Sequence, residues 1–319
     1  MDNYIPLILF DTDMDTDCDD AGALAILIEY AKHGMAEISA IVTDCPDRYA
    51  PTACELICNW YGVHPLIGTI YDDEFPEEIT DRYVRYRTHR KTLPKDIYYN
   101  RTTSKLIGKT DKDYPSSVSV YRKALAQAED NSVIVLAIGF LTAIEQLWNS
   151  EPDQYSELNG YDLFKNKVKF VVSMGDAAYP SSDNYNFNYN MDREGAKAFF
   201  GRCPCSIYVS PDGMDVISGS CFSSKLQVGH PLRTIYEIYN QGANKGRMSW
   251  DLIALLFALD PSSDLFRIET HGTVCYDDSC NKVYWNEQGS RIDYQISSTI
   301  SPEDMADLLD KIMIGERFK

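Results

Sequence analysis

An apolar run near the start of the chain ends in a dense cluster of acids. Residues 5–10 read Ile-Pro-Leu-Ile-Leu-Phe, and six aspartates follow at positions 11–20. A run of this length and branching is typical of a buried strand, and the apolar residues after it, from Ala21 to Ile28, recur at helical spacing, with Gly34 as the predicted helix end. The acids are therefore predicted to occupy a strand-to-helix turn at the carboxyl end of a strand, where open α/β sheets bind ligands.

Six carboxylates this close together repel one another unless a positive charge lies among them. A hard divalent cation with oxygen ligands would neutralise them. A solvated acidic loop is the alternative, and the wholly apolar strand that leads into the cluster argues against it. An EF-hand is excluded, because no loop that starts at Asp11, Asp13 or Asp15 has glycine at its sixth position and glutamate at its twelfth.

The acidic turn also resembles the signature of the haloacid dehalogenase phosphatases, an apolar strand followed by Asp-x-Asp-x-Thr. Residues 11–14 match it, but Asp15 stands where that signature has its hydroxyl. The same family needs a later lysine and a Gly-Asp-x-x-x-Asp turn. Residues 175–176 begin such a turn, whereas Pro180 occupies the place of the second acid. This phosphatase remains an alternative.

The segment resembles most the opening of the nucleoside hydrolases, which reads apolar strand, Asp-Thr-Asp, short turn and Asp-Asp-Ala. Residues 11–13 and 19–21 match this signature. The turn between them, residues 14–18, is longer than usual and carries an additional acid, Asp17. In this it is similar to a divergent bacterial branch of the family.

Three later segments resemble the same family in the same order. Residues 133–138 and the following Gly-Phe-Leu-Thr are similar to a strand and turn in which a backbone carbonyl, here that of Ile138, ligates calcium. Residues 169–175 lead to Asn-Phe-Asn, where Asn188 matches a ribose-binding asparagine and Asn186 replaces a glutamate. The family's His-Asp pair is here Trp250 followed by an aspartate that opens an apolar helix.

The resemblance extends over about residues 5–260 and implies a calcium-dependent hydrolase that cleaves the N-glycosidic bond of a ribonucleoside or related riboside. It implies a set of roles for the matched residues. Asp13 would be the catalytic base. The calcium ligands would be Asp13, Asp20, Asp251 and the carbonyl of Ile138. The substrate would contact Asp19, Asn186, Asn188 and Trp250, and Asp11 would orient the ligands from behind them. Family likeness further suggests a homodimer or homotetramer.

The rest of the pattern predicts an α/β fold with an open, mostly parallel central sheet flanked by helices. Strand-like runs near 5–11, 37–43, 133–138, 167–174 and 206–209 alternate with helical stretches. Neither a Gly/Ser/Pro-rich linker nor an internal repeat divides the chain, so we expect one nucleoside hydrolase-like domain over residues 1–319.

The amino-acid composition limits the classes of molecule that the protein is expected to bind. Thirty basic and 48 acidic residues give a net charge of −18, which would repel a nucleic-acid polymer, whereas a nucleoside is uncharged. The nine cysteines are scattered without zinc spacing, and there are only five histidines, so reduced thiols in a cytoplasmic protein are expected. The sequence has no signal peptide or membrane span, although a chain cleaved from its leader would read the same.

Two segments allow more than one interpretation. Six basic residues lie between Arg82 and Lys105 among tyrosines, which could bind phosphate and stack on bases, or form a solvated face or a subunit contact. The loop from Tyr179 to Asn190, rich in Tyr and Asn, could bind a sugar or pack over the sheet edge. A non-catalytic nucleoside or sugar binder on the same fold is the second functional hypothesis, because Asn186 and Trp250 depart from the family.

Overall fold

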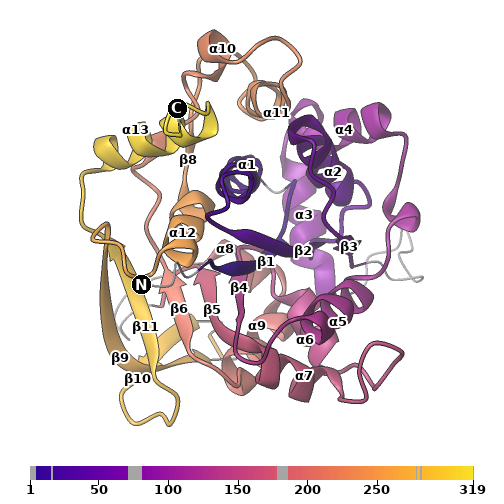
Figure 1. Ribbon diagram of the computed structural model, residues 1–319, viewed down its shortest axis with the longest axis vertical. Helices are drawn as coiled ribbons and strands as arrows, with labels where there is room; N and C mark the ends of the chain where they lie inside the picture. The colour runs from indigo at the N-terminus through magenta and orange to yellow at the C-terminus, as the bar shows by residue number, and fades with distance from the viewer. Residues whose placement is uncertain are drawn as a thin grey trace.

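A nine-stranded sheet of order β10-β9-β11-β6-β5-β4-β1-β2-β3 forms the centre of the protein (Figure 1). The computed structural model describes residues 5–15, 17–70, 81–177, 186–277, 279–280 and 282–318. Neighbouring strands from β3 to β11 in this order are parallel, and β9 and β10 extend one edge in antiparallel pairing. The predicted fold class, an open and mostly parallel sheet flanked by helices, is confirmed.

The strands of this sheet are β1 (Leu7–Thr12), β2 (Glu37–Thr43), β3 (Ile67–Thr69), β4 (Val133–Ala137), β5 (Val168–Met174), β6 (Ile207–Ser210), β9 (Phe266–Asp277), β10 (Lys282–Asn286) and β11 (Asp293–Ser298). A separate antiparallel pair consists of β7 (Ile217–Ser218) and β8 (Arg247–Met248). All five strands expected from the sequence are present, as β1, β2, β4, β5 and β6.

The longer helices are α1 (Asp19–Lys32), α2 (Ala50–Tyr61), α3 (Val84–Thr92), α4 (Tyr99–Ile107), α5 (Ser117–Gln127), α6 (Thr142–Trp148), α7 (Gly160–Lys167), α9 (Arg193–Arg202), α11 (Pro231–Tyr239), α12 (Trp250–Leu259) and α13 (Pro302–Met313). Shorter ones are α8 (Phe187–Met191), α10 (Phe222–Lys225) and the 3-10 turns η1 (Asp81–Tyr83), η2 (Lys95–Ile97) and η3 (Asp111–Asp113). None of the described helices has the length and apolar character needed to cross a membrane.

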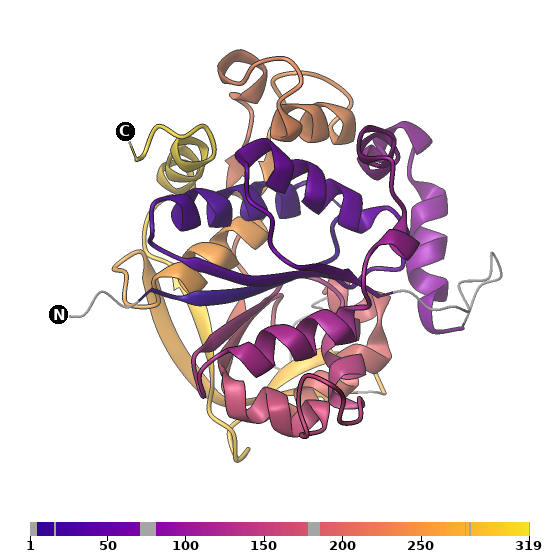
Figure 2. The same ribbon diagram turned by 45° about the vertical axis from the view of Figure 1, so that its right-hand side comes forward.

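Helices cover both faces of the sheet, which explains why β1 is apolar from Leu7 to Phe10. In Figures 1 and 2, α1, α2, α12 and α13 lie on one side of the sheet and α5, α6, α7 and α9 on the other. Two buried clusters fill these layers: Phe10 packs with the first set and Leu9 with the second. Successive side chains of a strand point to opposite faces, so one strand supplies both cores.

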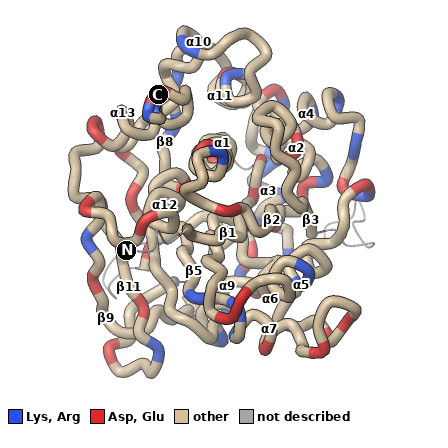
Figure 3. The backbone as a smooth tube through the Cα atoms, viewed as in Figure 1, with Lys and Arg blue, Asp and Glu red and all other residues tan. Residues whose placement is uncertain are grey.

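The parallel arrangement brings the carboxyl ends of β1, β4, β5 and β6 to one edge, where α1 and α12 also begin. Helix α1 starts at Asp19, so the last two acids of the cluster belong to its first turn. It ends before Gly34, whose φ of 68° is readily adopted by glycine. Figure 3 shows charged residues of both signs scattered over the molecule. Acids from distant segments meet where α1 and α12 begin, since Asp19 and Asp20 lie close to Asp251 there.

Candidate metal and substrate site

A cavity of about 380 Å³ opens at this edge of the sheet. Its walls come from the turn after β1, helix α3, the end of β5, helix α8, the loop after β6, the end of α11, and the segment where β8 leads into α12. The lining residues are Asp13, Asp17, Asp19, Asp20, His89, Leu93, Met174, Gly175, Asp176, Asn186, Phe187, Asn188, Pro211, Met214, Tyr239, Arg247, Trp250 and Asp251.

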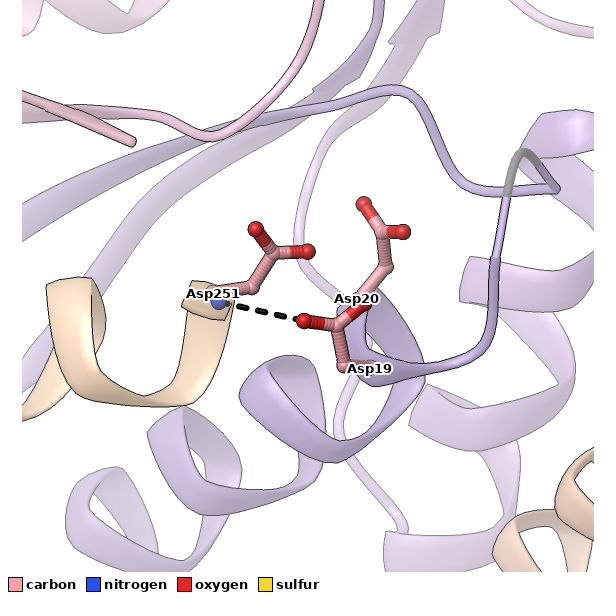
Figure 4. Close-up of side chains that lie close together, drawn as sticks. All are labelled: Asp19, Asp20 and Asp251. Carbon is pink, nitrogen blue, oxygen red and sulfur yellow. Dashed lines mark hydrogen bonds between the residues drawn. The ribbon is translucent and has the colours of Figure 1, made fainter. Parts of the chain in front are cut away.

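Three of the residues that line the cavity are buried aspartates. Asp19 and Asp20 lie in the first turn of α1 and Asp251 in the first turn of α12, with one oxygen of each within 4.8 Å of the others (Figure 4). The backbone N–H of Asp251 donates to Asp19 Oδ2 at 3.2 Å. The partial positive charge of two helix N-termini therefore faces the three carboxylates, which stabilises negative charge there.

These carboxylates are costly to ionise without a cation. Burial, followed by the neighbouring acids, raises the pKa of Asp19 and Asp251 well above the ordinary value, and burial raises the pKa of Asp20 to about 8 although Thr12 donates a hydrogen bond to it. The buried Oδ1 of Asp251 has no hydrogen-bond partner among the residues that the structure describes. An all-oxygen donor set with an orphaned carboxylate oxygen fits a hard divalent cation.

The remaining residues expected at the metal lie around this triad. Asp13 follows β1, is 2% exposed and lines the cavity. The carbonyl of Ile138 follows β4 and accepts a hydrogen bond of 2.8 Å from Asn188 Nδ2, so the expected backbone ligand and the expected ribose-binding asparagine are in contact. Ile138 itself is not among the cavity-lining residues.

Asn186 is the N-cap of α8, immediately before its first residue, and lines the cavity. Its Oδ1 accepts from the backbone N–H of Tyr189 at 3.1 Å, which caps the helix. The side chain of Asn186 lies close to the backbone of Gly175 (φ 151°). Only glycine leaves room for it, since a Cβ at position 175 would lie 2.6 Å from Asn186 Nδ2. The short helix therefore holds Asn186 and Asn188 against the carboxyl ends of β4 and β5.

Asp11 lies behind the cavity rather than in its wall. Tyr121 donates a hydrogen bond to its Oδ2, and Asp44 is its charged neighbour. Burial, followed by the charge of Asp44, raises the pKa of Asp11 well above the ordinary value, and burial raises the pKa of Asp44 to about 6. The expected role of Asp11, to orient ligands without touching the substrate, stays a prediction.

Trp250 forms part of the cavity wall beside two residues that the sequence analysis missed. The guanidinium of Arg247 lies 5.5 Å from the Trp250 ring centroid and 5.3 Å from that of Tyr239. Gly213 (φ 146°) packs against the Trp250 backbone, where a Cβ would come within 2.5 Å. Arg247 and Tyr239 belong to no motif, and only the folded chain brings them to this wall.

His89 is a third cavity residue that was missed. It lies on α3, half-buried, with its ring 5.0 Å from that of Phe187, and burial together with the charge of Arg90 lowers its pKa. This lowered pKa favours the neutral form of the His89 ring. The sequence did contain a clue to His89, because this residue lies inside the basic and aromatic segment between Arg82 and Lys105.

One arginine of that basic segment holds internal acids, whereas Lys91, Lys95 and Arg101 of the same segment are exposed. Arg90 pairs with Asp15 of the long turn, and its Nη2 lies 3.3 Å from Asp47 Oδ2. Tyr99 accepts from the backbone N–H of Asp15 at 2.7 Å and donates to the Asp17 carbonyl at 2.6 Å. The extended turn is therefore held from the side of α3 and α4.

The conformation of Asp15 shows why the turn needs this support. Its φ is 116°, a region that residues with a side chain rarely adopt, and its carboxylate is fully buried. Burial raises the pKa of Asp15 well above the ordinary value, and the Arg90 charge opposes this shift. The ion pair with Arg90 therefore offsets both strain and desolvation.

We expect Arg90→Met to destabilise the protein by about 2 kcal/mol or more, because it leaves a buried carboxylate without its partner. The double variant Asp15→Asn/Arg90→Met should recover a large part of that loss. Urea unfolding of the single and double variants measures both values. Equal stability of Arg90→Met and the unaltered protein would contradict this account of the turn.

Two expectations concern residues 178–185, which lie outside the described residues: the Pro180 position of the phosphatase pattern and most of the loop rich in Tyr and Asn. All nine cysteines are free thiols, and the sulfurs of Cys203 and Cys205 lie 3.9 Å apart.

Comparison with known proteins gives a match in structure but not in sequence. No protein-family model matches the chain, and no curated protein sequence matches it. Among solved structures, an inosine-uridine preferring nucleoside hydrolase from Bacillus anthracis matches with a TM-score of 0.63 and 16% identity, over 98% of this chain and 100% of that one. An inosine-guanosine nucleoside hydrolase matches with a TM-score of 0.65 and 14% identity, over 97% and 99% of the two chains.

A third similar structure is the type III effector protein XopQ complexed with adenosine diphosphate ribose. Its TM-score is 0.68 with 16% identity, over 98% of this chain and 94% of that one. Because all three matches extend over nearly the whole of both chains, they concern the complete architecture rather than a shared sheet motif. At this level of identity they establish the fold and leave the activity open. The chain has the fold of the nucleoside hydrolases, as the signature at its amino end predicted.

Proposed function

We propose that this protein is a calcium-dependent hydrolase that cleaves the N-glycosidic bond of a ribonucleoside or related riboside. The observation that carries the proposal is the buried triad of Asp19, Asp20 and Asp251, which lines one cavity together with Asp13 and Asn188. Carboxylates in such number and burial are characteristic of a hard cation, and calcium accepts oxygen ligands in flexible geometry.

Different residues around the triad would bind the metal, accept the proton and hold the sugar. Calcium, when bound by Asp13, Asp20, Asp251 and the Ile138 carbonyl, would supply positive charge beside the ribose hydroxyls and an adjacent water. Asp13 would accept a proton from this water as its oxygen bonds to the anomeric carbon. Asn188 and Asp19 would hydrogen-bond ribose hydroxyls and fix the sugar for in-line attack, with Asn186 as a further sugar contact.

The bond between the anomeric carbon and the base nitrogen breaks as the new bond forms, and its electron pair leaves with the base. The transition state then resembles an oxocarbenium ion, as in other glycoside hydrolysis. The buried carboxylates around the sugar favour this positive charge electrostatically. Asp11, behind the cavity, would hold the β1 turn in register with β4 by its backbone contact to Ile138.

A non-catalytic binder on the same fold is the second candidate. It is favoured by the departures at Asn186 and Trp250 and by the existence of an effector of this fold whose structure contains adenosine diphosphate ribose. Reducing-sugar release from purine, pyrimidine and nicotinamide ribosides, with calcium or after chelation, separates the two. Free pentose that depends on calcium supports the hydrolase, whereas tight binding without pentose release supports the binder.

Trp250 leads to a prediction about substrates. An indole offers one N–H donor and no proton that titrates near neutral pH, so it cannot protonate a departing base. Stacking of a base on Trp250 would contribute about 1–3 kcal/mol of binding free energy. We therefore expect slow hydrolysis of inosine and much faster hydrolysis of p-nitrophenyl riboside, whose leaving group needs no protonation.

The measurement is the ratio of the two kcat/KM values, with Trp250→Phe as a variant that keeps the aromatic ring. This variant should change the ratio little. A rapid inosine reaction with little preference for the activated substrate would mean that another cavity residue supplies the proton, and the argument from Trp250 would fail.

A further inference from the structure

We propose that the site acts on N-ribosides whose base carries a fixed positive charge, such as pyridinium ribosides, in preference to ribosides of neutral bases. The inference rests on the proposed hydrolase and names the substrate class of its site. It starts from the charges that line the cavity and from the way in which the leaving group receives the electron pair of the broken bond.

Negative charge predominates along the described wall of the cavity. Six aspartates line it, against one arginine and one histidine. Burial, followed by the charge of Arg90, lowers the pKa of His89 and favours its uncharged form. Arg247 balances Asp17, with its Nε 3.1 Å from Oδ2 of that residue. Once the two charges of a bound calcium are also counted, three negative charges remain in excess.

A neutral base is a poor leaving group in such a cavity. When the bond between the anomeric carbon and the base nitrogen breaks, the electron pair leaves with the base, so an unprotonated neutral base becomes an anion beside the carboxylates. Protonation would avoid this, but two aromatic residues of the wall are poor proton donors. The indole of Trp250 does not titrate near neutral pH, and burial raises the pKa of Tyr239 above its ordinary value.

A base with a fixed positive charge reverses this relation. The same electron pair neutralises the base nitrogen, so a pyridinium riboside releases an uncharged pyridine and needs no proton from the protein. The water oxygen bonds to the anomeric carbon and its proton passes to Asp13, so each turnover yields ribose, the free pyridine and one proton. The negative wall therefore attracts the substrate, and the leaving group departs without charge.

Phe187 gives such a ring a surface to bind. It is the first residue of α8, between Asn186 and Asn188, the two expected sugar contacts, and it lines the cavity. The face of an aromatic ring attracts positive charge. Trp250 is less suited, because the guanidinium of Arg247 lies 5.5 Å from its ring centroid and repels a second cation. We therefore expect the charged ring at Phe187, in a cavity whose volume of about 380 Å³ is in the range of small-molecule sites.

The test compares substrates that differ in charge. Nicotinamide riboside has a net positive charge, whereas the carboxylate of nicotinic acid riboside cancels the charge of the same ring. We expect the KM of nicotinamide riboside to be lower by about fivefold or more. Guanosine and 7-methylguanosine form a second pair, in which we expect kcat/KM to favour the methylated, cationic base by about tenfold or more, since only the neutral base needs a proton.

Met214→Lys tests the charge of the wall itself. Met214 lines the cavity and is 70% exposed, so a lysine there keeps its ammonium group in water. This variant should raise the KM of nicotinamide riboside by about threefold or more and change the KM of nicotinic acid riboside by less than about twofold. Added salt should reduce the difference between the two substrates in the unaltered protein, because it screens the wall.

Two control variants accompany this test. Met214→Gln removes the methionine without adding charge. Val228→Lys adds the same charge at a position that is 85% exposed and is not among the residues that line this cavity. Both should keep the ratio of the two KM values of the unaltered protein.

Equal KM values for the two pyridinium ribosides, or a ratio in Met214→Lys equal to that of its controls, would overturn the inference. Cleavage of inosine or p-nitrophenyl riboside without cleavage of nicotinamide riboside would overturn it and leave the hydrolase intact. If calcium binds and no riboside is cleaved, the proposed hydrolase fails separately. The inference is then decided by the dissociation constants of the two pyridinium ribosides, measured by calorimetry in the same variants, which must show the same preference and its loss in Met214→Lys.

Discussion

Replacement of Asp13 by asparagine is expected to lower turnover by about two or more orders of magnitude, the usual loss when a general base is removed. The amide keeps the size of the carboxylate and an oxygen that can remain near the metal, but it cannot accept the proton of the attacking water. Because Asp13 is 2% exposed at the end of β1, an isosteric change should leave the fold intact. Reducing-sugar assays at saturating substrate give the loss in kcat.

Asp176→Asn provides a matched control, since Asp176 lines the same cavity but has no assigned role in the reaction. It should retain a far larger share of the turnover. Affinity for the substrate should remain close to that of the unaltered protein in Asp13→Asn, since the ribose contacts from Asn188 persist. Undiminished turnover in Asp13→Asn would rule out its role as the base.

Loss of a carboxylate from the triad should empty the metal site. We expect the purified protein to carry about one calcium ion per chain, and Asp20→Ala or Asp251→Ala to abolish its retention through dialysis. Two effects combine: a ligand is lost, and the remaining buried acids face each other without the cation. Metal analysis together with thermal unfolding should show a lower calcium content and a lower Tm in both variants. Full calcium retention in both would contradict the assignment.

The pKa of Asp20 adds a pH dependence to this prediction. In the metal-free protein burial raises this pKa from 3.8 to about 8, so between these values the folded chain keeps a proton that the unfolded chain has lost. Its contribution to stability is therefore present at low pH and is lost as the pH rises through about 8. Calcium must displace this proton, so calcium affinity should increase from pH 6 to pH 8.

Calorimetry in buffers with different ionisation enthalpies would detect the released protons, and thermal unfolding with and without calcium would show a stabilisation by calcium that grows with pH. Asp20→Asn, which cannot take up the proton, should weaken both effects. Calcium affinity that is constant from pH 6 to pH 8 would contradict this linkage.

The sequence predicted those parts of the fold that depend on local patterns. Periodicity located β1, β2, β4, β5 and β6, because parallel strands buried on both faces read as continuous apolar runs. The acids at both ends of the turn between β1 and α1 could be assigned to the carboxyl edge of the sheet, because a strand and the helix that follows it place their connecting turn at that edge. Gly34 was identified as the end of α1 for a similar local reason.

The missed residues depend on contacts between segments far apart in the chain. Tyr239 reaches the cavity because α11 packs on α1, and Arg247 reaches it from β8 by pairing with Asp17, and neither residue stands in a spaced motif. The basic segment from Arg82 to Lys105 could be noticed from composition, but the partners of Arg90 lie at Asp15 and Asp47, which no local pattern specifies. Side-chain partners at such separations are set by tertiary packing.

The two arginines that hold the long turn have a consequence for the order in which the site can form. Asp15 is joined to Arg90 across 75 residues, and Asp17 to Arg247 across 230. Closing such large loops costs chain entropy that local contacts cannot repay early in folding. The acids of the turn are made first during synthesis, yet the turn acquires its final shape only when β8 has docked. A chain that is interrupted before residue 247 would contain most of the ligands and still lack a competent calcium site, so calcium would stabilise the completed fold and not its precursors.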